Sequence, residues 1–92
     1  MLKTKKKWTP LNSSNLAACR YFRQTGLLLI EFRSGSIYGY AGVGWPTYMR
    51  FRYAESHGSY FARNIRESFQ YKEFSPTELS EAGIPVPPPE SR

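Results

Sequence analysis

Two tyrosines separated by one residue, Tyr38 and Tyr40, are the side chains of this chain best suited to binding chemistry. They follow an aliphatic run at Leu27–Phe32 and a turn signal at Ser34-Gly35, so we expect them on a strand. Side chains two residues apart on a strand lie on the same face. Exposed aromatic rings on a sheet face can stack with the bases of single-stranded nucleic acid.

Basic side chains supply the second part of such a site. The 92-residue chain has a formal net charge of +6, and a basic protein attracts phosphate polymers non-specifically. With Phe22 as a third stacking ring, the predicted nucleic-acid-binding residues are Tyr38, Tyr40, Phe22, Arg20, Arg23, Lys3, Lys5, Lys6, Lys7, Arg50 and Arg52. Charge that serves solubility, on solvated helix faces, is the alternative explanation of the arginines and lysines.

Residues for catalysis and metal binding are sparse. The chain has no aspartate, one histidine (His57) and one cysteine (Cys19). A nucleophile–His–Asp triad cannot be assembled from this set, and one thiol with one imidazole is too few for a zinc site. We expect His57 at a helix end, where the helix dipole favours a cation. The sequence predicts no enzyme activity, no metal and no cofactor.

Length and cysteine content indicate a single small domain in a reducing compartment. Cys19 cannot form an intrachain disulfide, which fits the cytoplasm. The N-terminal lysines are not followed by an apolar stretch, so we expect no signal peptide. The longest aliphatic run, Leu27–Ile30, is too short to span a membrane, and we expect no membrane partner.

The first half of the chain has the pattern of strands. We expect strands at Leu16–Arg23, Leu27–Arg33 and Ser36–Val43, separated by turn residues at Gln24-Thr25-Gly26 and Ser34-Gly35. Consecutive strands with such short connections form an antiparallel meander.

The second half has the pattern of helices. Pro46 suits the first turn of a helix that Gly58 ends, and Ser59 is expected to cap a second helix. The second helix repeats apolar side chains on one face at Phe61, Ile65 and Phe69. We therefore predict an α+β fold in which a three-stranded antiparallel meander is followed by two helices packed on one sheet face.

The two ends of the chain are expected to lie outside this domain. Residues 1–9 form a flexible basic arm, residues 10–74 the domain, and residues 75–92 a short capped turn with a proline-rich tail. Ser75-Pro76-Thr77-Glu78 has the shape of a capping box, and Gly83 could end that turn. The prolines after Ile84 predict polyproline II structure, either as a solvated tail or as a ligand for a proline-binding groove.

The face that carries Tyr38 and Tyr40 depends on the hairpin loop. With Ser34-Gly35 as a two-residue loop, Glu31 pairs with Tyr38 and Leu29 pairs with Tyr40. Paired residues share a face, so this register places both tyrosines away from the helices. A one-residue bulge would reverse the parity and send both rings into the core.

The same register sets which side chains accompany the tyrosines. The face toward the helices would hold Leu28, Ile30, Phe32, Ile37, Gly39, Ala41 and Val43. Arg20 and Phe22 would join the tyrosines on the opposite, open face. A purely structural role is the alternative, because tyrosine is common in strands and stabilises cross-strand pairs.

Several landmarks occur together and in order. They are Ser13-Ser14-Asn15-Leu16, Tyr21, Leu28-x-Ile30-x-Phe32, Gly35, Tyr38-x-Tyr40, Val43, Ala54-x-Ser56-x-Gly58-x-Tyr60-Phe61, Ile65 and Phe69-x-Tyr71. Over about residues 13–71 the chain resembles the KTSC domain, a family named for its occurrence at the C-terminus of some lysyl-tRNA synthetases. The resemblance places the family motif at Ser14, Asn15, Tyr38, Tyr40, Ser56 and Gly58.

The resemblance implies a binding role rather than a defined mechanism. RNA binding has been suggested for the family through the synthetase association, and the family also occurs as free-standing bacterial and phage proteins. We therefore predict a small non-enzymatic module that binds RNA or single-stranded nucleic acid. The alternative is a protein-interaction module, such as a phage or mobile-element accessory protein docking on a host or virion complex. Either could be a monomer or a homodimer formed by edge-strand pairing.

Overall fold

The computed structural model describes residues 8–87, which form an α+β fold with a five-stranded antiparallel sheet and three helices. The strands are β1 (Thr9–Pro10), β2 (Leu16–Phe22), β3 (Leu27–Phe32), β4 (Ile37–Tyr40) and β5 (Tyr71–Phe74). The helices are α1 (Trp45–Arg52), α2 (His57–Asn64) and α3 (Pro76–Glu81). None of these helices is long and apolar enough to cross a membrane.

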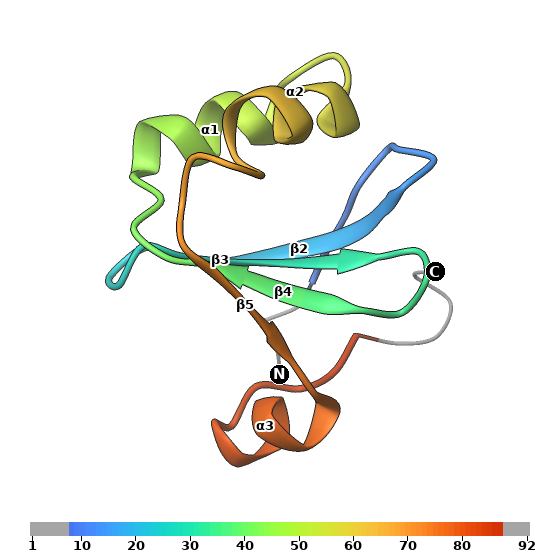
Figure 1. Ribbon diagram of the computed structural model, residues 1–92, viewed down its shortest axis with the longest axis vertical. Coiled ribbons are helices and arrows are strands. Elements are labelled where there is room, and N and C mark those ends of the chain that lie inside the picture. The colour runs from blue at the N-terminus through green and yellow to red at the C-terminus, as the bar shows by residue number, and fades with distance from the viewer. Residues whose placement is uncertain (1–7, 88–92) are drawn as a thin grey trace, which may run out of the picture.

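The strands lie in the sheet in the order of the chain, β1-β2-β3-β4-β5. Helices α1 and α2 cover one face of the sheet, and α3 lies on the other face (Figure 1). The predicted meander is present as β2, β3 and β4. The sequence did not predict β1, β5 or the covering of the second face, because these strands are short and have no alternating pattern of their own.

Each face of the sheet has its own apolar cluster. The cluster beneath α1 and α2 contains Leu11, Leu16, Cys19, Leu28, Ile30, Tyr40, Val43, Tyr48, Phe51, Phe61 and Ile65. The cluster on the α3 side contains Trp8, Ala18, Leu29, Ile37 and Leu79, with Phe22, Leu27, Phe74 and Ile84 packed around it. The sheet is therefore the middle layer of three, and neither face is the open, wet face that the sequence suggested.

The register of the β3–β4 hairpin differs from the predicted one by one residue. Ile30 pairs with Tyr38, and Leu28 pairs with Tyr40. Because paired residues share a face, both tyrosines lie on the α1–α2 side with the apolar core. The prediction that they face away from these helices is wrong.

The reason is the length of the loop. The backbone N–H of Phe32 donates to the Ser36 carbonyl at 2.8 Å, which leaves three residues in the loop instead of two. The Gly35 N–H closes a turn on the Phe32 carbonyl, and Gly35 adopts a φ of 102°. A three-residue hairpin loop with glycine in this left-handed region is a common alternative to the two-residue loop. It shifts the pairing by one residue and exchanges the faces.

The boundary between the two helices also differs from the prediction. The α1 helix begins with Pro46 in its first turn, as predicted, but it ends before Tyr53. Ser56 caps α2 by accepting a hydrogen bond from the Ser59 N–H at 3.1 Å. Gly58 therefore lies in the first turn of α2, and Ser59 is not the cap. Ser56 is the cap because a capping hydroxyl accepts from the backbone N–H three residues later, which here is that of Ser59.

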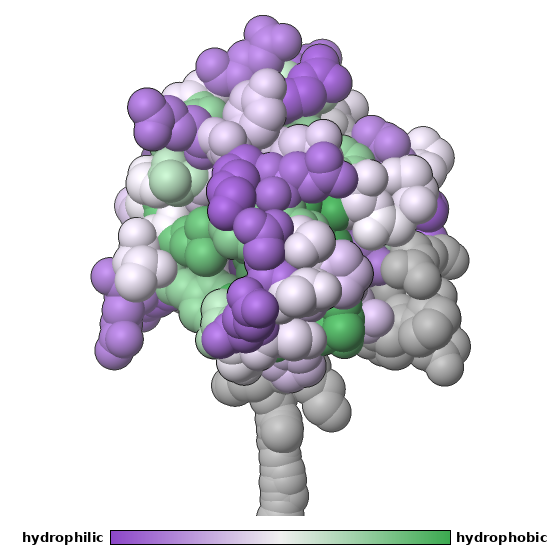
Figure 2. Space-filling model, turned by 60° about the horizontal axis from the view of Figure 1, so that its bottom comes forward, coloured by the Kyte–Doolittle hydropathy of each residue, from purple (hydrophilic) through white to green (hydrophobic). Residues whose placement is uncertain are grey.

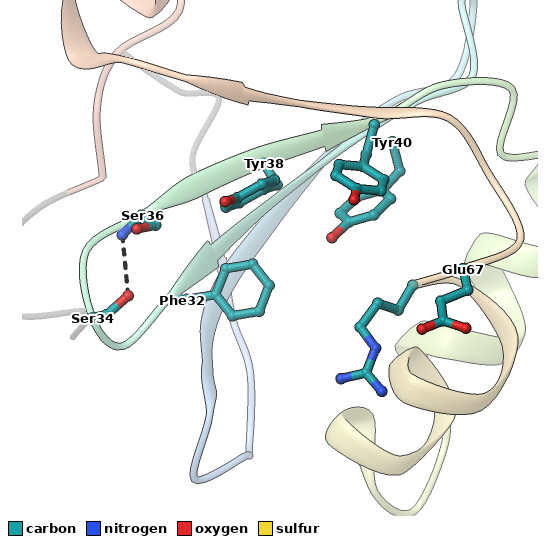
Figure 3. Close-up of a pocket in the computed structure, with 8 residues that line it drawn as sticks. Phe32, Ser34, Ser36, Tyr38, Tyr40 and Glu67 are labelled. Atoms are coloured by element: carbon teal, nitrogen blue, oxygen red, sulfur yellow. Dashed lines mark hydrogen bonds between the residues drawn. The ribbon is translucent and has the colours of Figure 1, made fainter.

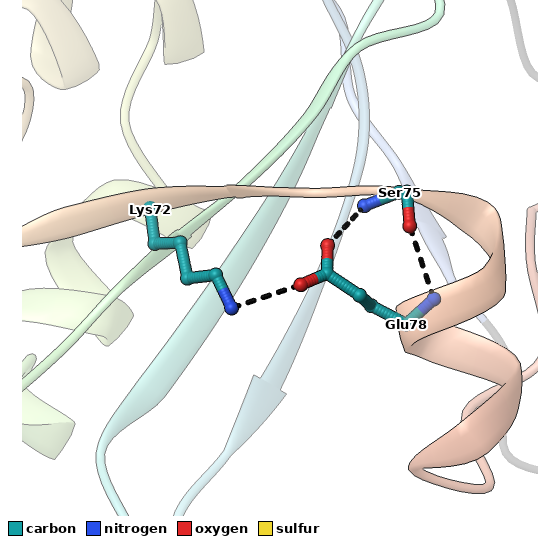
Figure 4. A network of polar contacts seen from close by, with 3 residues as sticks. All are labelled: Lys72, Ser75 and Glu78. Carbon is teal, nitrogen blue, oxygen red and sulfur yellow. Dashed lines mark hydrogen bonds and ion pairs between the residues drawn. The ribbon is translucent and has the colours of Figure 1, made fainter.

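The capping box that the sequence predicts for α3 is present (Figure 4). The Ser75 hydroxyl accepts from the Glu78 N–H at 3.1 Å, and the Glu78 carboxylate accepts from the Ser75 N–H at 2.8 Å. Lys72 on β5 donates to the other Glu78 oxygen at 3.0 Å. These contacts lower the pKa of Glu78, with the Ser75 backbone N–H as the largest cause.

The predicted end of α3 is present too. Gly83 has a φ of 78°, and its N–H donates to the Ser80 carbonyl at 3.0 Å. The Ile84 N–H donates back to the Leu79 carbonyl at 2.9 Å. This pair of bonds is the Schellman arrangement, in which a hydrophobic contact accompanies the turn. It brings Ile84 back beside Leu79 on the second face of the sheet.

Candidate nucleic-acid interface

An aromatic hollow of about 470 Å³ opens on the helix-side face of the sheet, next to β4 and β5. Its lining residues are Phe32, Ser34, Ser36, Tyr38, Tyr40, Arg66, Glu67 and Tyr71. Figure 3 shows Phe32, Tyr38 and Tyr40 projecting from the strands, with Glu67 facing them from the segment that follows α2. The hollow therefore lies between the sheet and the residues after the second helix.

The strand register brings the aromatic rings together. Tyr40 pairs with Tyr71 on β5, and the two ring centroids are 5.7 Å apart. Tyr38 lies between Phe32 and Tyr71, with centroid distances of 5.7 and 5.9 Å. The exposed fraction rises from 3% at Tyr40 to 61% at Tyr71, so the rings extend from the core to solvent.

The hollow combines these rings with two opposite charges. Burial, followed by the neighbouring phenols of Tyr38 and Tyr71, raises the pKa of Tyr40 to about 12, so its hydroxyl keeps its proton at neutral pH. Arg66 acts in the opposite sense on this pKa, which places its guanidinium within electrostatic reach of Tyr40. Arg66 and Glu67 are both exposed. The arrangement can stack a planar group against the rings and hold an anion at Arg66.

Phe22 and Arg20 do not join this hollow. Their side chains lie on the α3 side of the sheet, where Phe22 packs against the second apolar cluster. The guanidinium carbon of Arg20 lies 5.1 Å from the centroid of the Phe22 ring. The prediction that Phe22, Tyr38 and Tyr40 share one face is therefore wrong, because the reversed hairpin parity separates them.

The other predicted basic residues lie elsewhere. The guanidinium carbon of Arg23 is 4.1 Å from the centroid of the Trp45 ring. Arg50 and Arg52 belong to α1, where the Arg52 guanidinium carbon lies 5.3 Å from the Tyr53 ring centroid. None of these residues lines the hollow. Outside the described part of the chain are Lys3, Lys5, Lys6 and Lys7.

A second polar cluster joins the loop before β2 to the start of α2. The Asn12 N–H donates to His57 Nδ1 at 3.0 Å, and His57 Nε2 lies 3.0 Å from the Arg52 carbonyl. A carbonyl accepts only, so Nε2 is the nitrogen that donates and Nδ1 is the one that accepts. His57 is the first residue of α2, so the expectation that it lies at the end of a helix is wrong. Across residues 8–87, no three His, Cys, Asp or Glu side chains gather as metal ligands.

Comparison with known families identifies the core of this structure. The KTSC domain matches residues 12–69, which include the strands β2, β3 and β4 and the helices α1 and α2 that cover them. The chain belongs to the KTSC domain family. The resemblance inferred from the sequence motifs is thereby confirmed.

A solved KTSC structure has the same fold. The KTSC domain protein of Yersinia pestis is 28% identical in sequence and superposes with a TM-score of 0.72. The similarity covers 97% of that protein but 75% of this chain. No curated protein sequence matches the chain. Residues outside the KTSC match include Trp8, β5 and α3.

Several KTSC motif positions hold the fold together. A Cβ atom on Gly58 would lie 3.0 Å from the Ser13 hydroxyl, so glycine lets α2 approach this loop closely. The same hydroxyl accepts from the N–H groups of Asn15 and Leu16, both at 3.1 Å. Together with the Ser56 cap, these contacts hold the motif segment that begins at Ser13 against the one that contains Gly58.

Sequence reasoning missed most of the residues that line the hollow. Phe32 was assigned to the core face, and Tyr71 was noted only as a landmark of the KTSC resemblance. The predicted second helix extends to Phe69 and includes Arg66 and Glu67, but α2 ends at Asn64, so both residues lie in the segment that follows it. The pairing of β4 with β5 is the feature that assembles the site, and it joins residues more than thirty positions apart.

Proposed function

We propose that this KTSC domain protein is a non-enzymatic module that binds single-stranded RNA in the aromatic hollow. The observation that supports the proposal is the exposed Tyr71 ring, which contacts the rings of both Tyr38 and Tyr40 in a hollow that Arg66 also lines. The reducing compartment inferred from the single Cys19 is part of the proposal, since cytoplasmic RNA would be the available ligand.

The form of the hollow suits an unpaired base. A base can stack on Tyr71, which is 61% exposed, while the buried Tyr40 supports that ring from behind. Duplex bases are already stacked and unavailable for such contact, so single strands and loops are the favoured targets. Arg66 offers a guanidinium to the adjoining phosphate, and the net charge of +6 adds a non-specific attraction.

Fluorescence anisotropy with labelled single-stranded RNA of about 12 nucleotides tests this proposal. We expect Tyr71→Ala to weaken binding roughly 5- to 150-fold, because one stacked base contributes about 1–3 kcal/mol. Arg66→Gln is expected to lower the slope of log affinity against log salt by about 0.7, the value for one phosphate on a single strand.

Two matched variants serve as controls. Tyr53 is 75% exposed and lies at the end of α1, so Tyr53→Ala removes an exposed tyrosine outside the hollow. Arg50→Gln removes an exposed arginine of α1 in the same way. Both should bind RNA almost as the wild type does. Equal losses in the control and hollow variants, or no binding at low salt, would refute the proposal.

A protein-interaction role is the second candidate, and the position of β5 favours it. Among the described strands β5 is at the edge of the sheet, and Tyr71, Lys72 and Glu73 are exposed along it. Extended peptides of other proteins can add to such an edge. Recovery of one stoichiometric protein partner that survives nuclease and high salt would favour this role, including that of a phage or mobile-element accessory protein.

A homodimer built on the same edge would pair β5 with its own copy. Two copies related by a twofold axis would continue one sheet only if residues of the same parity paired. A register centred on Lys72 or Glu73 would place like charges directly opposite each other, which destabilises a strand pair. Within β5, a register centred on Tyr71 or Phe74 is therefore the one that suits a homodimer.

A further inference from the structure

The sheet face opposite α1 and α2 has a covering that lies outside the KTSC match. The chain leaves β5, forms α3 and then runs back beneath the sheet (Figure 1). Trp8, which precedes β1, packs on the same face with Leu29, Ile37 and Leu79. Figure 2 views the molecule from nearer this side and shows hydrophobic surface between hydrophilic side chains.

The segment that follows α3 is held on this face by one hydrogen bond and one apolar contact, and a buried proline lies three residues after that contact. The indole N–H of Trp8 donates to the Pro85 carbonyl at 2.8 Å. Ile84 packs against the apolar cluster, and Pro87 is buried. Val86, between Ile84 and Pro87, is 44% exposed. The expectation of a solvated tail is therefore wrong for Ile84 and Pro87, whereas the side chains of Pro85 and Val86 are exposed.

The spacing of Ile84 and Pro87 matches that of a polyproline II ligand. This conformation has three residues per turn, so Ile84 and Pro87 fall on the same side. It makes no internal hydrogen bonds, which leaves its carbonyls free to accept from the receptor. Domains that recognise proline-rich peptides present an aromatic groove to such a ligand. Trp8 fills this role within the same chain.

Arg20 provides a second donor on this surface. Thr9 pairs with Cys19 and Pro10 with Ala18, and continuing this ladder by one residue brings Trp8 beside Arg20. The Nη1 atom of Arg20 is buried, and no described residue accepts a hydrogen bond from it. A buried donor without an acceptor is costly, and the described part of the tail, which ends at Pro87, does not supply one. A backbone carbonyl of a longer extended ligand is the type of group that this donor lacks.

We propose that the surface around Trp8 and Arg20 recognises polyproline II peptides with an aliphatic residue and a proline three positions apart. The chain's own Ile84–Pro87 segment occupies this surface as an internal ligand. The surface is on the opposite face from the aromatic hollow, so the proposal is independent of RNA binding there.

The internal ligand determines how the surface must be tested. A tethered segment competes at an effective concentration of the order of millimolar, so a free peptide at micromolar concentration cannot displace it from the wild type. The contacts of Ile84 and Pro87 have to be weakened within the full chain before a peptide can bind in trans. Trp8 then becomes the natural reporter, because the tail shields its indole.

The experiment uses the full chain with Trp45→Phe, which leaves Trp8 as the single tryptophan. Adding Ile84→Ala and Pro87→Ala should shift Trp8 emission to the red and speed hydrogen exchange at its indole N–H. A synthetic peptide with the wild-type sequence of residues 82–89 should then reverse both changes in a saturable way. In the protein with the wild-type tail, the same peptide should change neither Trp8 emission nor exchange of the indole N–H.

Two controls separate recognition from general apolar binding. Val86→Ala changes an exposed residue of the same segment and should leave Trp8 emission and exchange unchanged. A peptide with alanine at the positions of Ile84 and Pro87 should fail to reverse the shift. An equal response to both peptides would overturn the proposal, as would a folded tail variant with unchanged Trp8 signals or no response to the wild-type peptide.

Far-UV circular dichroism establishes whether the doubly substituted tail leaves the sheet and helices folded. Should the fold be lost, Pro87→Ala alone replaces the double change in both measurements. Arg20→Met then supplies an independent result, since deleting the second donor should reduce the affinity of the peptide severalfold. An unchanged affinity would remove Arg20 from the recognition surface and overturn its part of the proposal.

Discussion

Gly39, between the two tyrosines, shows how closely the second face of the sheet is filled. A Cβ atom at this position would lie 2.6 Å from Cε1 of Phe74 and 3.1 Å from Cδ2 of Leu29. The sequence analysis placed Gly39 on the face toward α1 and α2. In the structure the space above Gly39 is on the opposite face, where it is filled by the ring of Phe74.

We predict that Gly39→Ala lowers the free energy of unfolding by about 1–3 kcal/mol, because the added methyl group overpacks this contact. Urea unfolding followed by circular dichroism measures the change. Gly44→Ala is the matched control, since its Cβ would lie 3.6 Å from Cδ of Pro46, an ordinary contact, at a φ of −73°. A Gly39→Ala protein as stable as this control would contradict the packing argument.

At the scale of elements, His57 joins three parts of the fold. Its ring accepts from the loop before β2, donates to the last residue of α1, and belongs to the first turn of α2. The ring also lies 5.6 Å from that of Phe51, measured between centroids. One side chain thus links the loop before β2 to both helices.

His57→Ala is expected to destabilise the protein by about 1–3 kcal/mol, because the Asn12 N–H and the Arg52 carbonyl lose their partner. Thermal and urea unfolding both measure this loss. Asn64→Ala removes an exposed side-chain bond to the Tyr60 carbonyl at 3.3 Å and serves as the control. The control should change stability by no more than about 0.5 kcal/mol. A similar effect of both substitutions would argue against a joint at His57.

At the scale of the whole molecule, the apolar cluster beneath α1 and α2 holds one thiol and two phenols in their neutral forms. Burial raises the pKa of Cys19 from 9.0 to about 11 and those of Tyr40 and Tyr48 from 10.0 to about 12. In the unfolded chain these groups lose their protons at lower pH than in the folded protein. Their contribution to stability is complete below about pH 9 and is lost as the pH rises toward 12.

We therefore expect these three groups to leave the urea midpoint unchanged up to about pH 9 and to lower it above that pH. Cys19→Ala should remove the contribution of the thiol, which is lost between pH 9 and about 11, and leave that of the two tyrosines, which is lost between pH 10 and about 12. Below pH 9 the native thiol should resist alkylation, since Cys19 is 0% exposed and protonated. A flat stability profile up to pH 11 would contradict this account.

Much of the fold follows from local sequence signals. Apolar runs between turn residues mark β2 and β3, the Ser75 capping box and Gly83 mark α3, and Pro46 marks the start of α1. These features depend on hydrogen bonds and torsion angles within a few residues, so their chemistry is visible in the sequence. The motif order was also sufficient to indicate the family.

The faces of the two tyrosines depended on the tertiary structure. The same Ser34-Gly35 sequence permits a two- or a three-residue loop, and one residue of difference moves Tyr38 and Tyr40 across the sheet. Pairing of β4 with the distant β5 then surrounds Tyr38 with Phe32 and Tyr71. The sequence by itself determined that the tyrosines share a face, because the period of a strand is two. Only long-range pairing and packing decided which face it is and what surrounds it.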